Sequence, residues 1–225
     1  MKNKNIFIAC DVSSQKDILN LLELIHEDIS GIKIGLQYIT QRSPEEIREL
    51  SKFNKPIFYD GKFFDIKNTL VESVKSLENL NVNYATVHLL NGLDALKAAN
   101  QTAQEINLNL LGVSILTSFD DEDLENLGFR STVKDQVTRL IKIAIEAGLY
   151  GVICSPYEIK MIKEIAPKLK CFTPGIRMGN EKDDQKRTMT ANEAIKEGSD
   201  CLIIGRPITK GNPQENIKNI LSSID

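Results

Sequence analysis

The stretch Pro56-Ile57-Phe58-Tyr59-Asp60-Gly61-Lys62-Phe63-Phe64-Asp65 joins an apolar run to a cluster of three charges. Side chains at positions i and i+2 of a strand point the same way, so Asp60 and Lys62 are expected side by side. The apolar residues that follow have the spacing of a helix: Ile66, Leu70, Val74 and Leu77. Strand, charged turn and helix form the unit of a parallel α/β fold, in which chemistry occurs at the carboxyl ends of strands.

The alternation of apolar runs and amphipathic helices continues along the whole chain. Eight runs are predicted as strands: Ile6–Asp11, Gly31–Leu36, Pro56–Asp60, Tyr84–Leu90, Leu108–Leu116, Gly151–Cys154, Leu169–Thr173 and Cys201–Gly205. No segment resembles a linker, and 225 residues suit one domain. The sequence therefore predicts a single-domain α/β protein, residues 1–225, folded as a (β/α)8 TIM barrel. An open doubly wound sheet is the alternative, although no G-x-G-x-x-G follows the first strand.

Composition and charge limit the class of function. A net charge of −3 argues against a broad surface for nucleic acid or anionic membrane. The apolar run Ile6–Cys10 is too short for a signal-peptide core or a membrane span, and no later run is longer. Four scattered cysteines without a C-x-x-C pair are expected to be buried thiols of a cytoplasmic protein: Cys10, Cys154, Cys171 and Cys201. Neither a zinc site nor a disulfide framework is expected.

Polar residues recur where the predicted strands end, which is where a barrel places its working groups. Lys33 lies inside an apolar strand, where a cation is costly without a partner, and the acids after the third strand are suitable partners. Lys33, Asp60, Lys62 and Asp65 are predicted to form an alternating array in which each neighbour favours its partner's charged form. Other strand ends carry further polar candidates: Asp11, His88, Thr117 and Ser118.

A structural interpretation of the charged motif is the alternative. Asp65 could cap the following helix, and Asp60 with Lys62 could form a solvated ion pair contributing under ~1 kcal/mol. The lysine at position 33 favours the functional interpretation, whereas His88 alone leaves both interpretations open.

The last third of the chain predicts an anion site. Thr173–Arg177 ends the seventh strand and opens a long polar loop, about 178–190, which is predicted to be a lid. After the eighth strand, Gly205 allows a close backbone approach and Arg206 offers a forked cationic donor. The loops after the seventh and eighth strands are the usual phosphate cradle of these barrels.

Over essentially its whole length, the chain resembles the bacterial branch of the orotidine 5'-monophosphate decarboxylase family. The resemblance is carried by Asp11, Lys33, the D-x-K-x-x-D motif of Asp60–Asp65, Thr69, Thr173–Arg177, Asp184–Arg187 and Ile204–Pro207. One departure is Met178, which follows Arg177 where the family commonly has proline.

The resemblance implies cofactor-independent and metal-free conversion of orotidine 5'-monophosphate to uridine 5'-monophosphate in de novo pyrimidine biosynthesis. Lys62 would protonate C6 and Asp60 would face the substrate carboxylate, while Lys33 and Asp65 hold the array. The implied substrate-binding residues are Asp11, Lys33, Thr69, Thr117, Arg177, Gln185, Gly205 and Arg206. The implied working unit is a homodimer in which Asp65 and Thr69 reach the neighbouring subunit's site.

Two other functions are weighed against this one. A magnesium-dependent keto-sugar-phosphate decarboxylase or aldolase shares the D-x-K-x-x-D motif, but such relatives have a glutamate where this chain has Lys33. A non-catalytic nucleotide-binding relative would have no physical need to keep an array of buried charges.

Overall fold

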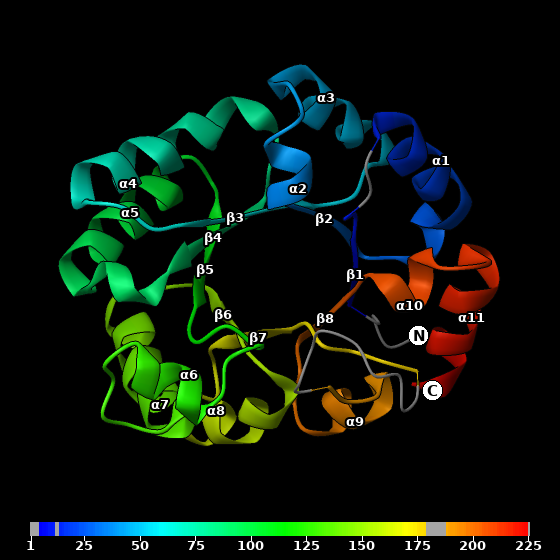
Figure 1. The fold of residues 1–225 in the computed structure, drawn as a ribbon. Helices are drawn as coiled ribbons and strands as arrows, with labels where there is room; N and C mark the ends of the chain where they lie inside the picture. Colours follow the sequence, from blue (N-terminus) through cyan, green and yellow to red (C-terminus); the bar gives the residue numbers. More distant parts are fainter. Residues whose placement is uncertain (1–4, 12–13, 179–187, 225) are drawn as a thin grey trace.

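The computed structural model describes residues 5–11, 14–178 and 188–224, and it forms a closed barrel of eight parallel strands (Figure 1). The strands are β1 Ile6–Ala9, β2 Gly31–Gly35, β3 Ile57–Phe63, β4 Tyr84–His88, β5 Asn109–Val113, β6 Gly151–Ile153, β7 Lys170–Thr173 and β8 Cys201–Ile204. Each strand pairs with the next in sequence order, and β8 pairs with β1. The TIM-barrel prediction is therefore confirmed, and the open sheet is excluded.

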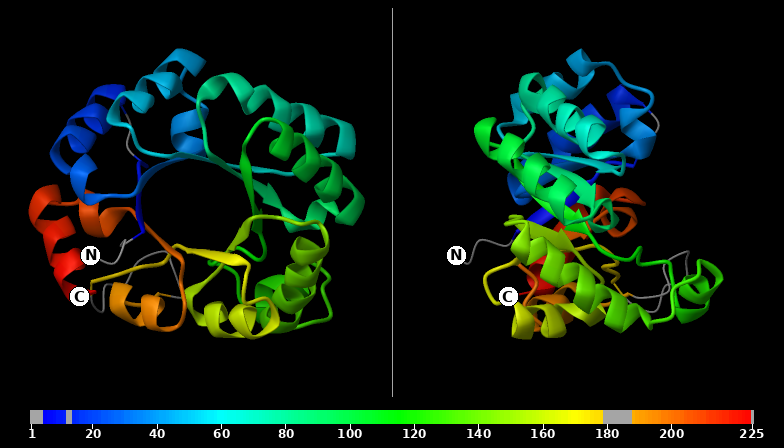
Figure 2. Two further views of the ribbon diagram at one scale, coloured as in Figure 1. Left: turned by 180° about the vertical axis from the view of Figure 1, so that it is seen from behind. Right: turned by 90° about the vertical axis from the view of Figure 1, so that its left-hand side faces the viewer.

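Helices form an outer ring around the strands, as the views from behind and from the side show (Figure 2). The α-helices are α1 Gln15–Ile25, α2 Leu36–Ile39, α3 Pro44–Glu49, α4 Lys67–Lys75, α5 Leu93–Glu105, α6 Asp121–Asn126, α7 Val133–Glu146, α8 Ile159–Ile165, α9 Ala191–Lys196, α10 Arg206–Thr209 and α11 Pro213–Ser223. Short 3-10 helices are η1 His26–Asp28, η2 Leu50–Phe53, η3 Ser76–Leu80, η4 Leu89–Asn91 and η5 Pro156–Glu158. Within the described ranges, no helix combines the length and apolar character needed to cross a membrane. The cytoplasmic location stays a prediction.

The third strand differs from its predicted bounds. β3 does not end at Asp60 but continues to Phe63, because its register against β4 shifts after Tyr59 and pairing resumes between Phe63 and Val87. Within this irregular stretch Lys62 has a φ of 48°, in the left-handed region. Asp60 and Lys62 thus lie on a distorted strand, and Asp65 follows two residues after its end.

Six other strands end one to three residues earlier than the sequence predicts, and in β1 and β5 the difference concerns candidate site residues. β1 ends at Ala9, so Asp11 lies two residues beyond it. β5 ends at Val113, so Thr117 and Ser118 belong to the following loop and not to the strand end. In both cases the apolar run continues past the last residue that pairs with a neighbouring strand.

Aromatic side chains fill the barrel interior. Phe7, Phe58 and Phe172 are buried there, and the rings of Phe58 and Phe172 pack edge to face with centroids 6.2 Å apart. Tyr84 closes the cluster against Phe7 with a centroid distance of 5.6 Å. A second and larger apolar core lies between the strands and the helices. All four cysteines are buried and free, as predicted.

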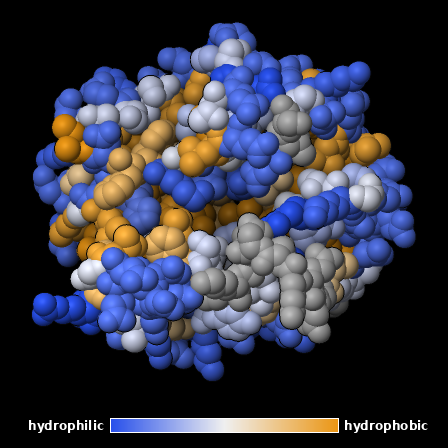
Figure 3. All heavy atoms as spheres, viewed as in Figure 1, coloured by the Kyte–Doolittle hydropathy of each residue, from blue (hydrophilic) through white to orange (hydrophobic). Residues whose placement is uncertain are grey.

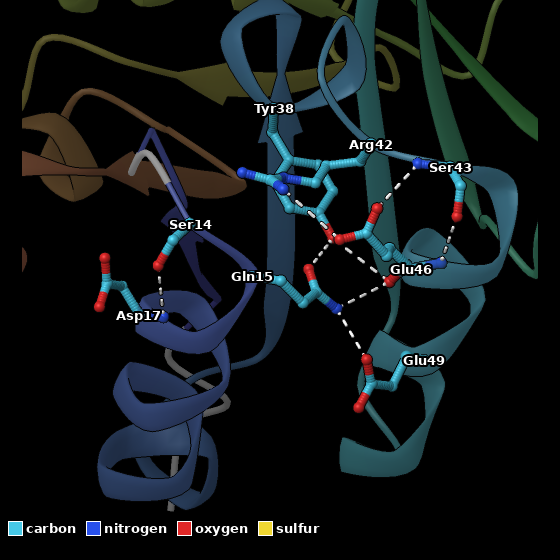
Figure 4. Close-up of polar contacts among 8 residues, drawn as sticks. All are labelled: Ser14, Gln15, Asp17, Tyr38, Arg42, Ser43, Glu46 and Glu49. Atoms are coloured by element: carbon cyan, nitrogen blue, oxygen red, sulfur yellow. Dashed lines mark hydrogen bonds and ion pairs between the residues drawn. The ribbon is translucent and has the colours of Figure 1, made fainter.

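A polar network ties α1 to the segment that follows β2 (Figure 4). The buried Tyr38 donates its hydroxyl to the side chain of Gln15 and to the backbone carbonyl of Glu46. The amide of Gln15 donates to the same carbonyl at 3.1 Å and to Glu49 at 2.9 Å. The network therefore holds α1 and α3 together beside β1 and β2, the strands that carry or precede Asp11 and Lys33.

Phe58→Ala is expected to lower the free energy of unfolding by about 3–5 kcal/mol, because it opens a cavity among packed rings. Denaturant unfolding would measure the loss. Leu127→Ala, at a side chain 61% exposed, is the control and should change stability by under ~0.5 kcal/mol. Similar losses in both variants would contradict the assignment of the interior cluster.

Candidate active site

A pocket of about 610 Å³ opens at the carboxyl ends of the strands. Its apolar lining includes Ala9, Val113, Ile153 and Ile203 from the barrel strands and Ile115, Leu116 and Pro174 from loops, and its polar lining comes from both strands and loops. Viewed along the barrel, hydrophilic side chains surround a hollow with hydrophobic residues in its depth (Figure 3). The volume and the mixed lining suit a small-molecule site.

Four charged side chains form a row along one wall of this pocket. Lys33 Nζ lies 3.2 Å from Asp11 Oδ1 and 3.6 Å from Asp60 Oδ2. The same oxygen of Asp60 lies 2.8 Å from Lys62 Nζ. The row therefore alternates anion and cation from Asp11 to Lys62, and its two central members, Lys33 and Asp60, are buried.

The buried members of the row hold each other in their charged forms. Burial alone would lower the pKa of Lys33, but the carboxylates of Asp60 and Asp11 raise it above its ordinary value. Burial alone would raise the pKa of Asp60, but Lys33, Lys62 and a hydrogen bond from Thr86 bring it below its ordinary value. Both groups are therefore charged at neutral pH, so they present a fixed electrostatic field to the pocket.

Gly35 provides the space in which the first pair meets. A Cβ atom at this position would lie 2.8 Å from Asp11 Oδ1 and 3.1 Å from Lys33 Nζ. A side chain at residue 35 would therefore push apart the carboxylate and the ammonium group.

Two residues that the sequence did not single out hold the charged motif from β4 and η4. Thr86 donates its hydroxyl to Asp60 Oδ1 at 2.9 Å and accepts from the backbone N–H of Lys62 at 2.8 Å. Asn91 donates to the carbonyl of Phe63 at 2.9 Å and accepts from the backbone N–H of Asp65 at 3.0 Å. A signal for Thr86 was present, since it is a polar residue two positions before His88 on an otherwise apolar strand.

Asp65 lies outside the row in its own chain. Its side chain is exposed and accepts from the N–H of Ile66 at 2.7 Å, while the N-cap residue of α4 is Ile66 itself. The helix-cap interpretation of Asp65 is therefore wrong. Within one chain the fourth member of the row is Asp11, and Thr69 is exposed on α4.

His88 is the last residue of β4 and lies beside the charged motif. Its Nδ1 accepts from the backbone N–H of Leu90 at 3.3 Å, which places the neutral ring's proton on the other nitrogen. Burial, together with the charge of Lys62, lowers the pKa of His88, and its ring lies 5.5 Å from that of Phe64.

The opposite side of the pocket carries two arginines. Arg177 is 5% exposed and donates from Nη1 to the carbonyl of Ile176 at 2.8 Å. Its backbone N–H donates to the carbonyl of Met189 at 3.0 Å, which joins the two stems of the predicted lid. Arg206, the first residue of α10, lines the pocket with Gly205 and Thr117. Gln185 and residues 179–187 of the predicted lid lie outside the described part of the chain.

This fold and this site define the chain as a (β/α)8-barrel enzyme with its polar groups at the carboxyl ends of the strands. Comparison with known proteins agrees: the family described as "Orotidine 5'-phosphate decarboxylase / HUMPS family" matches residues 4–220. The chain belongs to this family. In the described ranges no three His, Cys, Asp or Glu side chains are grouped as ligands for a metal ion.

Individual relatives give the same result. The chain is 38% identical over 221 residues to the orotidine 5'-phosphate decarboxylase of Wolbachia pipientis subsp. Culex pipiens (strain wPip), covering 97% of this chain and 98% of that protein. It is 38% identical over 225 residues to the enzyme of that name from Legionella pneumophila (strain Lens), with the same coverage. The crystal structure of orotidine 5'-phosphate decarboxylase from Lactobacillus acidophilus matches with a TM-score of 0.86 at 29% identity, covering 99% of this chain and 100% of that one.

Asp60→Asn is expected to lower the free energy of unfolding by about 3 kcal/mol at pH 7, because the buried Lys33 loses a charged partner. The pKa of Asp60 is lower in the folded protein than in the unfolded chain. The stability that the ionised Asp60 contributes is therefore fully present above the unfolded-state pKa of about 3.9, and it is lost as the pH falls through the lower folded-state pKa. Urea unfolding measured from pH 7 to pH 3 should show the free energies of unfolding of the wild type and Asp60→Asn converging as the pH falls.

Glu146→Gln is the control for this titration. Glu146 forms an exposed pair with Lys97 at 3.1 Å, so the substitution should change stability by under ~1 kcal/mol. A constant difference between wild type and Asp60→Asn down to pH 3 would contradict the ionised, paired state of Asp60.

Proposed function

We propose that the protein decarboxylates orotidine 5'-monophosphate to uridine 5'-monophosphate in de novo pyrimidine biosynthesis, without a cofactor. The observation that carries the proposal is Lys62, which ends the row of alternating charges with its side chain 34% exposed at the pocket. Arginines on the opposite wall suit a phosphate at the far end of the same ligand. The names of the curated relatives support the same substrate.

Lys62 is assigned the chemical step. When the bond between C6 and the carboxylate breaks, carbon dioxide leaves and the electron pair stays on C6. A proton from the Lys62 ammonium then forms the new C–H bond, and the amine regains a proton from solvent. A preorganised cation beside the developing charge is the largest stabilising effect open to an enzyme without an electron-sink cofactor. Asp60 is assigned the place against the substrate carboxylate.

The remaining predicted residues are assigned to binding. Asp11 and Lys33 would contact the ribose hydroxyls, and Thr117 would lie near the pyrimidine. The phosphate would be bound by Gln185, Gly205 and Arg206, with Arg177 at the base of the 178–190 lid. Binding energy at the phosphate, remote from C6, would support loop closure and thereby the chemical step.

The working unit is proposed to be a homodimer with C2 symmetry. Three apolar side chains near the motif are exposed, with relative exposures of 62% for Phe64, 74% for Ile66 and 38% for Leu90. Hydrophobic residues also gather on the surface over α4 and α5, at the left of Figure 3. Asp65 and Thr69 flank this surface and would reach the neighbouring subunit's site.

The position of Lys33 disfavours the magnesium-dependent alternative. That chemistry needs acidic ligands that converge on a divalent cation. Here the ammonium group of Lys33 lies between the carboxylates of Asp11 and Asp60, and it supplies the positive charge itself.

The purified protein should consume orotidylate in excess chelator, followed as the loss of the substrate's ultraviolet absorbance. Lys62→Ala should lower kcat by at least ~10³-fold, because both the cation and the proton donor at C6 are removed. Uridylate binding should remain measurable in this variant, since the phosphate-binding groups are untouched.

Lys52→Ala is the matched control, because Lys52 is an exposed lysine paired with Glu49 away from the pocket. It should turn over orotidylate at the wild-type rate. A requirement for added magnesium, or near-normal turnover by Lys62→Ala, would reject the proposal.

Subunit mixing tests the dimer. Lys62→Ala and Asp65→Ala should each be inactive, but co-refolded mixtures should recover about a quarter of wild-type activity, because each hybrid dimer contains one complete site. Activity would be measured against the mixing ratio. No recovery, with hybrid dimers confirmed by mass spectrometry, would show that Asp65 does not act across the interface.

A further inference from the structure

We propose that Thr86 is a positioning residue, whose single hydroxyl oxygen fixes both the carboxylate of Asp60 and the backbone of Lys62. Its effect on catalysis rests on the proposed function, whereas its effect on the position of Lys62 does not. Thr86 is fully buried on β4, so it acts through these two residues and not on a ligand directly.

The direction of both hydrogen bonds follows from chemistry. The backbone N–H of Lys62 can only donate, so Thr86 Oγ1 accepts from it at 2.8 Å. An ionised carboxylate can only accept, so the hydroxyl proton of Thr86 goes to Asp60 Oδ1 at 2.9 Å. The hydroxyl of Thr86 therefore acts as both a hydrogen-bond donor and an acceptor, and no apolar side chain of the same shape can replace it.

Thr86 also fixes which oxygen of Asp60 faces the lysines. Oδ1 accepts from Thr86, while Oδ2 lies 2.8 Å from Lys62 Nζ and 3.6 Å from Lys33 Nζ. Without the bond to Oδ1, the carboxylate could rotate about its terminal torsion, which is a soft one. Both ion pairs of the central carboxylate depend on this orientation.

The backbone of Lys62 needs the second bond because its conformation is unfavourable. The other non-glycine residues with positive φ in the described chain are asparagines, which tolerate this region: Asn54, Asn81 and Asn107. A lysine there costs about 1–2 kcal/mol. The ladder between β3 and β4 is interrupted at this point, and the hydroxyl of Thr86 satisfies the N–H of Lys62. The strained residue that carries the assigned proton donor is thus held by a side chain of the next strand.

Thr86→Val keeps the shape of the side chain and removes the hydroxyl. We expect kcat on orotidylate to fall about 10²-fold with KM changed by less than about threefold, because the ammonium group is misplaced while the phosphate contacts remain. The acid limb of kcat/KM should move to higher pH, since Asp60 loses a hydrogen bond that lowers its pKa. Thr86→Ser keeps the hydroxyl, so its kcat and KM should both lie within about threefold of the wild-type values.

A readout independent of turnover is the amide signal of Lys62 in protein labelled with 15N-lysine, assigned by its loss in Lys62→Arg. In Thr86→Val this signal should shift and its hydrogen exchange should accelerate at least ~10-fold, whereas Thr86→Ser should leave both unchanged. Thr173→Val is the matched control, because this equally buried threonine bonds Ser199 at 2.8 Å. It should leave the Lys62 amide unchanged.

An unchanged Lys62 amide together with wild-type kcat in folded Thr86→Val would overturn the proposal. If Thr86→Val does not fold, Thr86→Cys is measured instead. Because a thiol forms only weak hydrogen bonds, the kcat of this variant should be lower than that of the wild type, by less than about 10²-fold. A Thr86→Cys variant equal to wild type would overturn the proposal as well. If the wild type leaves orotidylate untouched, the proposed function fails, and the amide signals alone decide the role of Thr86.

Discussion

The carboxylate of Asp60, buried between the ammonium groups of Lys33 and Lys62, is the interaction on which the rest of the site depends. Desolvation makes an isolated charge at this depth unfavourable by several kcal/mol, so each member is stable only while its neighbours are in place. Asp11 extends the row to the pocket's edge, and Gly35 leaves space for it. The result is a line of fixed charges whose positions are set before any ligand arrives.

The distortion of β3 follows from the same constraint. A regular strand would pair continuously with β4, but here the register shifts after Tyr59 and Lys62 takes a left-handed φ. Thr86 and Asn91 bind the displaced segment at both ends, the first at Lys62 and the second at Phe63 and Asp65. Backbone strain is therefore located at the residue assigned the chemical step, and hydrogen bonds from the adjacent strand and its following turn offset it.

The polar groups that line the pocket come from two parts of the chain. The strands early in the chain carry the charged row, and the connections after β7 and β8 carry Arg177, Gly205 and Arg206. Pairing of β8 with β1 closes the barrel and brings both sets of groups to the lining of one pocket, although more than about 110 residues separate them in sequence. In the proposed function one ligand would use both parts of the pocket, with its pyrimidine at the charged row and its phosphate at the arginines.

The sequence by itself determined the architecture, because eight apolar runs alternate with amphipathic helices and few folds bury such a pattern. It also determined the residue types of the charged row, since Lys33 in an apolar strand required acidic partners. Tertiary structure decided what periodicity cannot encode: that β3 continues to Phe63, that Asp11 and not Asp65 completes the row within one chain, and that Thr86 supports it. These outcomes depend on pairing register and side-chain distances between strands, which arise only when the barrel closes and brings distant residues to within hydrogen-bonding reach.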